Sequence, residues 1–370
     1  MRVVLWVQHL LGTGHTVRAA AIGRALAAKG ASVRMLLGAP PPSQVNFDGI
    51  EVLELPAVHA TDGSFQRIET QDGADYATVA DERASRILSV IEEVRPNILL
   101  TETFPFGRRK FAGELMPSIE AARAMGSVVA ASVRDVLVRK PPPKERWMAD
   151  MALRHFHRVL VHGDERFATL GESFGLASEV SELIRYTGYA EAGPVPESAE
   201  NRLGVVVSAG GSGVGERLVK TAIEAAALGP ADVPWRILVS KKLEHHLPAW
   251  RANAPAHSVL EPNRPDFRAV LASAALSVSQ AGYNTVLDAL LAGPRMILVP
   301  FAVHEETEQT DRAAALAARG LARVLSEAVL SPKALASAVK NALREPLPRT
   351  PTIDINGARR SAEILFADAR

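Results

Sequence analysis

The chain has 370 residues, of which 47% are hydrophobic and 22% charged, with a formal net charge of +1 and no cysteine. This composition is typical of a globular enzyme of two or three domains, and it shows no electrostatic footprint for nucleic acid. Without cysteine there are no disulfides, no thiolate metal sites and no cysteine nucleophile, which fits a reducing cytoplasm.

The first apolar run breaks at Gly12 and leads into an amphipathic helical pattern. We therefore interpret it as a buried strand and not as a signal peptide, which would need a longer apolar core and a small-residue cleavage site. No stretch approaches the roughly 20 apolar residues of a membrane-spanning helix. These features favour a cytoplasmic protein.

Short β-branched runs alternate with longer Ala- and Leu-rich helical patterns in the first half of the chain. The predicted strands are Arg2–Gln8, Ser32–Leu37, Glu51–Leu55, Asn97–Thr101, Ser127–Val133 and Arg158–His162. The predicted helices are Thr16–Lys29, Tyr76–Val94 and Phe111–Met125. Such alternation predicts a parallel sheet covered on both faces, while residues 51–76 read as a strand followed by a long mobile loop.

The pattern then restarts after a Gly- and Pro-rich linker, Gly188–Pro196. The predicted strands of the second half are Gly204–Ser208, Trp235–Ser240, Ser258–Glu261, Ala275–Ser279, Arg295–Pro300 and Ala322–Leu325. We predict an α/β protein with two Rossmann-like parallel-sheet domains, residues 1–188 and 198–345, facing a central cleft. Residues 346–370 would end in a helix that crosses back to the first domain. Ligands of such sheets bind beyond the carboxyl ends of the strands.

The first Gly-rich turn, Gly12-Thr13-Gly14-His15, joins the first strand to a helix. Its glycines permit close approach of the backbone to a ligand, and the helix start offers free N–H groups to an anion. His15 can take a proton near neutral pH, as a general base must. The alternative is a tight turn in which the histidine only caps the helix or packs locally.

The second turn also joins a strand to a helix and contains Gly210, Gly211 and Ser212, which form a plausible phosphate cradle. Hydrolysis of a nucleoside triphosphate is disfavoured because the Lys-Ser/Thr ending of a P-loop is missing. An ordinary flexible turn is the alternative.

A third turn, QAGYNTVLDALLAG, places Gly282 at a strand end and Asn284 and Thr285 at a helix start, where a diphosphate can bind. Asp288 follows one turn later on the Thr285 face and can accept hydrogen bonds from a ribose; a solvated helix charge is the alternative. The next segment, VPFAVHEETEQ, offers His304, Glu308 and Gln309 to sugar hydroxyls, whereas its other glutamates suit an acidic helix start.

Polar residues also follow the other strands of the first half, where they would shape an acceptor site. They are Glu102, Arg108, Arg134 and His162. The arginines can bind an anionic acceptor, or they are ordinary surface residues. The segments FPFGRRKF and KPPPKERWM interleave basic and aromatic residues, which leaves peripheral contact with the inner face of a membrane open. No Asp-x-Asp or spaced histidine pair stands at a strand end, so we expect no metal and no cofactor.

The GTGH turn, the Gly-rich turn of the second half, and QAGYNTVLDALLAG followed by VPFAVHEETEQ together resemble two-Rossmann (GT-B) glycosyltransferases. Within this class the chain resembles the bacterial cell-wall N-acetylglucosaminyltransferase and a group of predicted glycosyltransferases near it. The resemblance implies that Asp288 takes the place of a ribose-binding Glu and that Gln309 contacts the donor sugar. It also implies that Glu308 replaces a Gln, and that the glycine turns hold the donor phosphates.

These observations predict an inverting, metal-independent transfer of a sugar from a nucleotide, UDP by the resemblance, to an unknown acceptor hydroxyl, with His15 as base. The segment GTGHTVRAAAIGRALAAKG also resembles UDP-sugar hydrolases of the pseudaminic acid pathway. A hydrolase, a UDP-sugar epimerase and a non-catalytic nucleotide-sugar binder therefore remain as alternatives.

Overall fold

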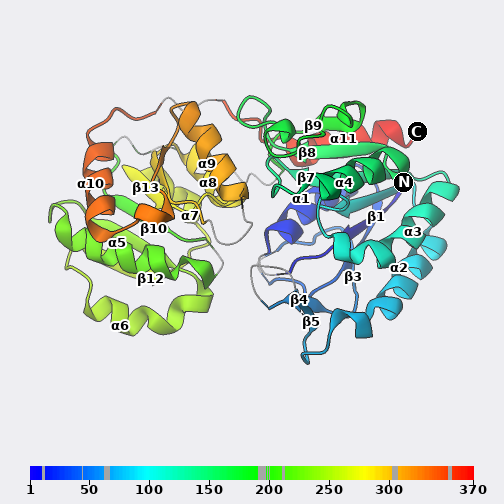
Figure 1. The fold of residues 1–370 in the computed structure, drawn as a ribbon, viewed down its shortest axis with the longest axis horizontal. Coiled ribbons are helices and arrows are strands. Elements are labelled where there is room, and N and C mark those ends of the chain that lie inside the picture. The colour runs from blue at the N-terminus through cyan, green and yellow to red at the C-terminus, as the bar shows by residue number, and fades with distance from the viewer. Residues whose placement is uncertain are drawn as a thin grey trace. The chain divides into compact units, whose positions relative to one another are not determined.

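The computed structural model describes residues 1–10, 13–43, 45–61, 67–190, 197, 199, 201–210, 213–301, 307–348 and 352–370. The chain forms two compact units (Figure 1). The first unit consists of Met1–Glu191 together with Asp354–Arg370, and the second of Ala192–Ile353. The cleft expected between the domains stays a prediction.

The first unit is built on a parallel sheet of seven strands in the order β3-β2-β1-β6-β7-β8-β9. Its strands are β1 (Arg2–Val7), β2 (Ser32–Leu37), β3 (Ile50–Glu54), β6 (Ile98–Glu102), β7 (Val128–Arg134), β8 (Arg158–His162) and β9 (Ile184–Tyr186). Its helices are α1 (Gly14–Ala28), α2 (Ala80–Val94), α3 (Ala112–Ala124), α4 (Pro142–His155) and α11 (Gly357–Asp368). The short 3-10 turns are η1 (Tyr76–Thr78), η2 (Arg109–Phe111), η3 (Leu170–Glu172) and η4 (Ser181–Leu183).

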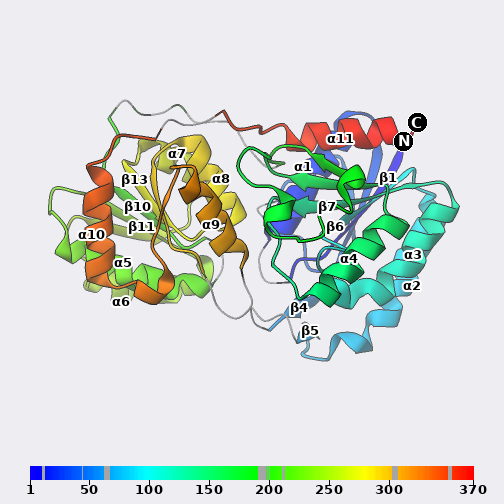
Figure 2. The same ribbon diagram turned by 45° about the horizontal axis from the view of Figure 1, so that its top comes forward.

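Helices cover both faces of this sheet (Figure 2). Val4 and Trp6 of β1 point into a core shared with α2, α3 and α4. Val3 and Leu5 point to the opposite face, where α1 and α11 pack. A strand buried on both faces needs a continuous apolar run, which is what the sequence of β1 supplies.

The second unit is built on a parallel sheet of six strands in the order β12-β11-β10-β13-β14-β15. Its strands are β10 (Val205–Ser208), β11 (Trp235–Val239), β12 (Ser258–Pro262), β13 (Leu276–Ser279), β14 (Arg295–Leu298) and β15 (Arg323–Val324). Its helices are α5 (Glu216–Leu228), α6 (Leu247–Ala252), α7 (Phe267–Ser273), α8 (Tyr283–Ala292), α9 (Glu308–Ala318) and α10 (Pro332–Leu343). Its 3-10 turns are η5 (Gly213–Gly215), η6 (Lys241–His246) and η7 (Glu327–Val329).

Both sheets change direction at one point of their strand order. In the first sheet the chain runs outward from β1 to β3 and then returns to place β6 beside β1. In the second sheet β13 returns beside β10 in the same way. Ligands of doubly wound sheets bind at such switch points. The residues after β1, β6, β10 and β13 are therefore the ones to examine.

Three features of the first unit differ from the sequence-based expectation. The segment after β3 is not a plain loop, because β4 (Val58–Ala60) and β5 (Ile68–Thr70) pair as an antiparallel hairpin. Helix α4 was not predicted, although Pro142 at its start suits a first helical turn. Strand β9 was not predicted either, because its three residues are too few to show a strand pattern in the sequence.

The C-terminal helix α11 packs on α1 in the first unit and buries Ala362 and Leu365 there. Its first residue, Gly357, approaches the backbone of residues 188–190 so closely that a Cβ would lie 2.3 Å from the Gly188 carbonyl oxygen. A side chain would not fit at this contact. Among the described residues, no helix is both long and apolar enough to cross a membrane.

Candidate active site

His15 lies at the start of α1, directly beyond the carboxyl end of β1. Its Nδ1 atom is 2.8 Å from Oε1 of Glu102, the last residue of β6, and 3.1 Å from the Thr103 hydroxyl. The imidazole keeps 15% of its surface exposed, whereas the Glu102 side chain is buried. The pairing joins residues 87 positions apart because β6 lies next to β1 at the switch point.

Glu102 is the centre of a buried network. Its Oε1 is ion-paired with Arg18, which lies one turn after His15 on α1, and its Oε2 accepts a 2.6 Å hydrogen bond from Ser132 on β7. Burial alone would raise the pKa of Glu102, but Arg18 first, and then the hydrogen bonds from His15 and Ser132, lower it well below its usual range. The carboxylate is therefore ionised at neutral pH.

Burial lowers the pKa of His15 to about 3, against the hydrogen bond to Glu102, which raises it. The positive charges of Arg108 and Arg134 also lower the pKa. The imidazole is therefore neutral at pH 7, with its Nδ1–H directed at the carboxylate. Within the part of the chain that the structure describes, its Nε2 takes part in no hydrogen bond. A neutral histidine oriented by a carboxylate can accept a proton at Nε2, and the lowered pKa makes it a weaker base than a free imidazole.

Both oxygens of Glu102 and both ring nitrogens of His162 are engaged in buried hydrogen bonds within the first unit. The place of the four residues in an acceptor site stays a prediction. Arg108 and Arg134 are partly exposed, and both act on the charge of His15. The Arg108 backbone is left-handed, with φ of 60°, and its Nε donates to the Gln8 carbonyl at 3.0 Å.

Arg18 and Ser132 were not predicted as site residues. A signal for Arg18 exists in the sequence, because residues three apart share one helix face and Arg18 follows His15 at that spacing. Ser132 has no such local signal, since it reaches Glu102 only through the neighbouring strand β7.

The basic and aromatic segments meet where η2 approaches α4, and the Arg109 guanidinium lies 5.0 Å from the Trp147 ring. The three phenylalanines of FPFGRRKF are buried in the core instead of lying on the surface: Phe104, Phe106 and Phe111. These rings are therefore unavailable for the membrane contact that the sequence left open.

In the second unit, Gly210 follows β10 with φ of 72°, a conformation that favours glycine. Asn263 holds this turn by donating from Nδ2 to the Gly210 carbonyl at 2.9 Å. A Cβ at Gly210 would lie 3.8 Å from the Thr285 hydroxyl, and one at Gly282 would lie 4.0 Å from it. The structure thus brings Gly210 of the second turn close to the third turn. Four predicted site residues lie outside the described residues: Gly12, Gly211, Ser212 and His304.

Helix α8 begins after Gly282 without a hydrogen bond from a capping side chain. Its apolar residues are buried, whereas Asn284, Thr285 and Asp288 remain partly exposed on one face. The first N–H groups of a helix carry partial positive charge and bind anions well. This helix start can therefore receive a diphosphate beside the Gly210 turn.

Asp288 is ion-paired with Arg268 of α7, whose Nε and terminal nitrogen lie 2.9 and 2.6 Å from Oδ1. Burial raises the pKa of Asp288, and Arg268 opposes that rise. The pair holds the carboxylate on the helix face that carries Thr285. The ribose contact of Asp288 stays a prediction.

Glu308 and Gln309 are the first two residues of α9, and their side chains stabilise the segments that follow β13 and β14. Oε1 of Gln309 accepts hydrogen bonds from the backbone N–H groups of Ala281 and Phe301, both at 3.0 Å. Glu308 is buried and its Oε1 is 2.8 Å from Arg312, which also donates to the Ala281 carbonyl at 2.9 Å. Both residues thus support the turn before α8, and their contact with a donor sugar stays a prediction.

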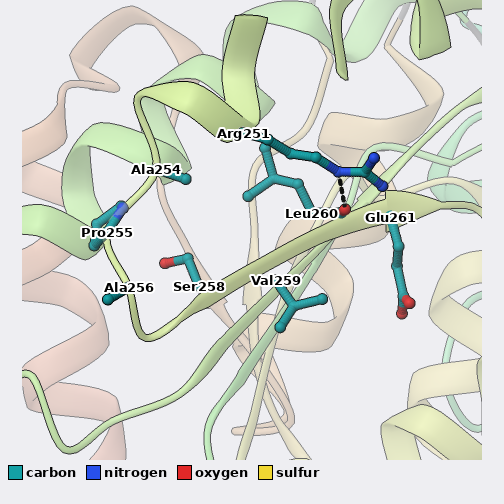
Figure 3. Close-up of a pocket in the computed structure, with 8 residues that line it drawn as sticks. All are labelled: Arg251, Ala254, Pro255, Ala256, Ser258, Val259, Leu260 and Glu261. Atoms are coloured by element: carbon teal, nitrogen blue, oxygen red, sulfur yellow. Dashed lines mark hydrogen bonds between the residues drawn. The ribbon is translucent and has the colours of Figure 1, made fainter. Parts of the chain in front are cut away.

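An open depression of about 470 Å³ lies elsewhere, where the end of α6 meets the edge strand β12 (Figure 3). Arg251 donates from Nε to the Leu260 carbonyl at 2.9 Å across it. Capping an edge carbonyl in this way reduces pairing with other strands. The depression lies on the far side of β11 from the Gly210 turn, so we do not assign it to the candidate site.

Comparison with known proteins identifies the fold and a family that part of the chain resembles. Residues 241–364 match the glycosyltransferase family 28 C-terminal domain. The fold matches Acinetobacter baumannii MurG with a TM-score of 0.64, covering 99% of both chains at 16% identity. It also matches a variant of Os79 from O. sativa in complex with UDP, with a TM-score of 0.62, 98% and 94% coverage, and 17% identity. The chain has the GT-B fold, and its residues 241–364 are similar to the C-terminal domain of glycosyltransferase family 28.

Among characterised proteins, the chain is similar to the UDP-N-acetylglucosamine–N-acetylmuramyl-(pentapeptide) pyrophosphoryl-undecaprenol N-acetylglucosamine transferase of Xanthomonas axonopodis pv. citri. The two are 30% identical over 193 residues, which is 49% of this chain and 45% of the relative. The match thus spans less than half of that relative's length.

Proposed function

We propose that the protein is a glycosyltransferase that moves a sugar from a nucleotide diphosphate, UDP, to an acceptor hydroxyl. The observation that carries the proposal is the pairing of His15 with the buried carboxylate of Glu102 at the switch point of the first sheet. The second unit supports it with an uncapped helix start beside a glycine turn at its own switch point.

UDP is proposed as the nucleotide for two reasons beyond the shape of the site. The similar Xanthomonas enzyme is named for a UDP-sugar, and the Os79 structure contains UDP. In this chain the α8 start would bind the diphosphate, and Asp288 would accept hydrogen bonds from the ribose.

In the proposed reaction, Nε2 of His15 takes the proton of the acceptor hydroxyl. The acceptor oxygen bonds to the anomeric carbon as the bond from that carbon to the diphosphate oxygen breaks, and UDP leaves. A single displacement of this kind inverts the anomeric centre. Glu102 stabilises the imidazolium that forms.

The leaving diphosphate needs compensation for its charge. We assign this role to the N–H groups at the start of α8, because preorganised donors stabilise charge that develops on a leaving group. Among the described residues, no group of three or more His, Asp or Glu side chains is placed to hold a metal ion. We therefore propose transfer without a metal.

Replacement of His15 tests the assignment of the base. We expect His15→Ala to release UDP from a UDP-sugar about 100-fold more slowly, because general-base catalysis contributes at least that much. Its affinity for UDP, measured by calorimetry, should remain unchanged, because the proposed nucleotide site lies in the second unit. His59→Ala serves as the control, since this exposed histidine of β4 lies outside the network. Normal turnover by His15→Ala would contradict the assignment.

A further inference from the structure

Another histidine of the first unit, His162, is fully buried at the end of β8. Its Nε2 lies 2.9 Å from the Ser132 hydroxyl and its Nδ1 lies 2.8 Å from the Thr187 hydroxyl. The proposed reaction uses none of these three residues directly. Together with Glu102 and His15 they form one continuous line of hydrogen bonds.

The direction of each bond in this line follows from its neighbours. The ionised Glu102 can only accept, so Ser132 must give its single hydroxyl proton to Oε2. The Ser132 oxygen can then only accept from His162, which places the proton of His162 on Nε2. Burial lowers the pKa of His162 to about 3, so the ring is neutral and its Nδ1 carries a lone pair. This atom lies 2.8 Å from the Thr187 hydroxyl, which is also within hydrogen-bond distance of the Gly188 and Val161 carbonyls. The donors of His15, Ser132 and His162 are all directed toward Glu102.

We propose that His162 is a positioning residue for the reaction of the previous subsection, on which this inference rests. Through Ser132 it fixes Oε2 of Glu102, and the fixed carboxylate holds the proton of His15 on Nδ1. That tautomer leaves the Nε2 lone pair of His15 open toward the acceptor. His162 thus selects the form of His15 that can act as a base.

The two oxygens of Glu102 are held differently. Arg18 and Thr103 both act on Oε1, the oxygen that His15 contacts, and both also lie within 3.3 Å of Nδ1 of His15. The charge of Arg18 also acts on His162, while Arg108 and Arg134 act on His15. The second oxygen is held by Ser132, and Ser132 is held by His162. Losing His162 should therefore release the Ser132 hydroxyl and weaken the hold on Oε2.

Two substitutions of His162 separate its hydrogen bond from its volume. His162→Gln places an amide N–H near the position of Nε2 and keeps the donor to Ser132, whereas His162→Leu removes the donor. We expect kcat of His162→Leu to fall about 10-fold, as for other residues that orient a functional group. KM for the UDP-sugar should stay unchanged, because the proposed donor site lies in the second unit. His162→Gln should restore kcat to within about threefold of the wild-type value.

Nitrogen NMR of histidine-labelled protein reports the tautomer of His15 without relying on turnover. We expect the Nδ1–H form in the wild type and in His162→Gln, and a mixture of both forms in His162→Leu. Ser132→Ala breaks the line at the next link and should behave like His162→Leu, which keeps the test available if the leucine variant does not fold.

The outcomes separate the two proposals. A folded His162→Leu or Ser132→Ala with an unchanged His15 tautomer and kcat within twofold of wild type would overturn the positioning role. If His15→Ala turns over normally while the tautomer still responds to His162, the proposed base fails and the coupling between the histidines stands. Loss of turnover in His162→Leu without rescue by His162→Gln would show a role in packing only and would also overturn the inference.

Discussion

Charge at the buried histidines decides how the first unit responds to pH. His15 and His162 both have a pKa lowered to about 3 in the folded protein, first of all by burial. In the unfolded chain their pKa lies near 6.5. Between these values the unfolded state binds protons that the folded state does not. The stability that comes from keeping the histidines neutral is complete above pH 6.5 and falls as the pH decreases toward 3.

We therefore expect the free energy of unfolding of the first unit to decrease on acidification from pH 6.5 to pH 4. Each buried histidine contributes a slope of up to about 1.4 kcal/mol per pH unit. Urea denaturation at several pH values measures this slope, followed by the fluorescence of Trp6 and Trp147 in a variant whose second-unit tryptophans, Trp235 and Trp250, are replaced by Phe. His162→Leu should make it shallower, whereas a slope that is the same with and without His162 would contradict the account.

The position of His15 could be predicted from sequence, but its partners could not. A histidine at the start of a helix after a buried strand indicates a base by local pattern alone, and that role stays a prediction. Glu102 and His162 were placed at strand ends, but the hydrogen bonds that join them to His15 through Ser132 were not predicted. These contacts depend on which strands are neighbours and on side-chain burial, and neither is visible in the local sequence.

At the scale of elements, α8 carries most of the evidence for nucleotide binding. Its start, its partly exposed face and its position after β13 agree with the sequence-based expectation, because a continuous apolar strand, a glycine and a helical pattern are all local signals. The hairpin β4–β5 was missed for the opposite reason. Its strands have three residues each, which is too short to show an alternating pattern.

The exposed face of α8 leads to a prediction about Asp288. Asp288→Ala should weaken UDP binding about 10-fold, because it removes a charged hydrogen-bond acceptor and leaves Arg268 without its carboxylate. Calorimetric titration with UDP measures the change. Asp232→Ala is the matched control, since Asp232 is exposed in the turn before β11 of the same unit. Equal affinity of Asp288→Ala and wild type would show that Asp288 serves only to hold Arg268.

At the scale of the whole molecule, the chain crosses between its units twice, near residues 191 and 353. Both crossings are anchored at one place in the first unit. Gly188 has φ of 81°, and a Cβ there would lie 2.7 Å from the Asp354 carbonyl oxygen, while Tyr189 donates its N–H to that oxygen at 2.8 Å. Thr187, the far end of the hydrogen-bonded line, directly precedes this anchor.

In the proposed reaction the first unit supplies the base and the second unit binds the nucleotide. The same two units could instead direct water at the sugar, or rearrange it on the nucleotide. The difference lies in which molecule donates the proton to His15. The reaction products therefore distinguish a transferase from a hydrolase or an epimerase more directly than any binding measurement.

The most direct test incubates the protein with a panel of UDP-sugars in the presence of EDTA, with and without a cell extract as the acceptor source, and identifies the products by mass spectrometry. Our account predicts UDP and a glycosylated product that form only when the extract is present and that are lost in His15→Ala. Free sugar released without extract, or a new UDP-sugar without release of UDP, would contradict it.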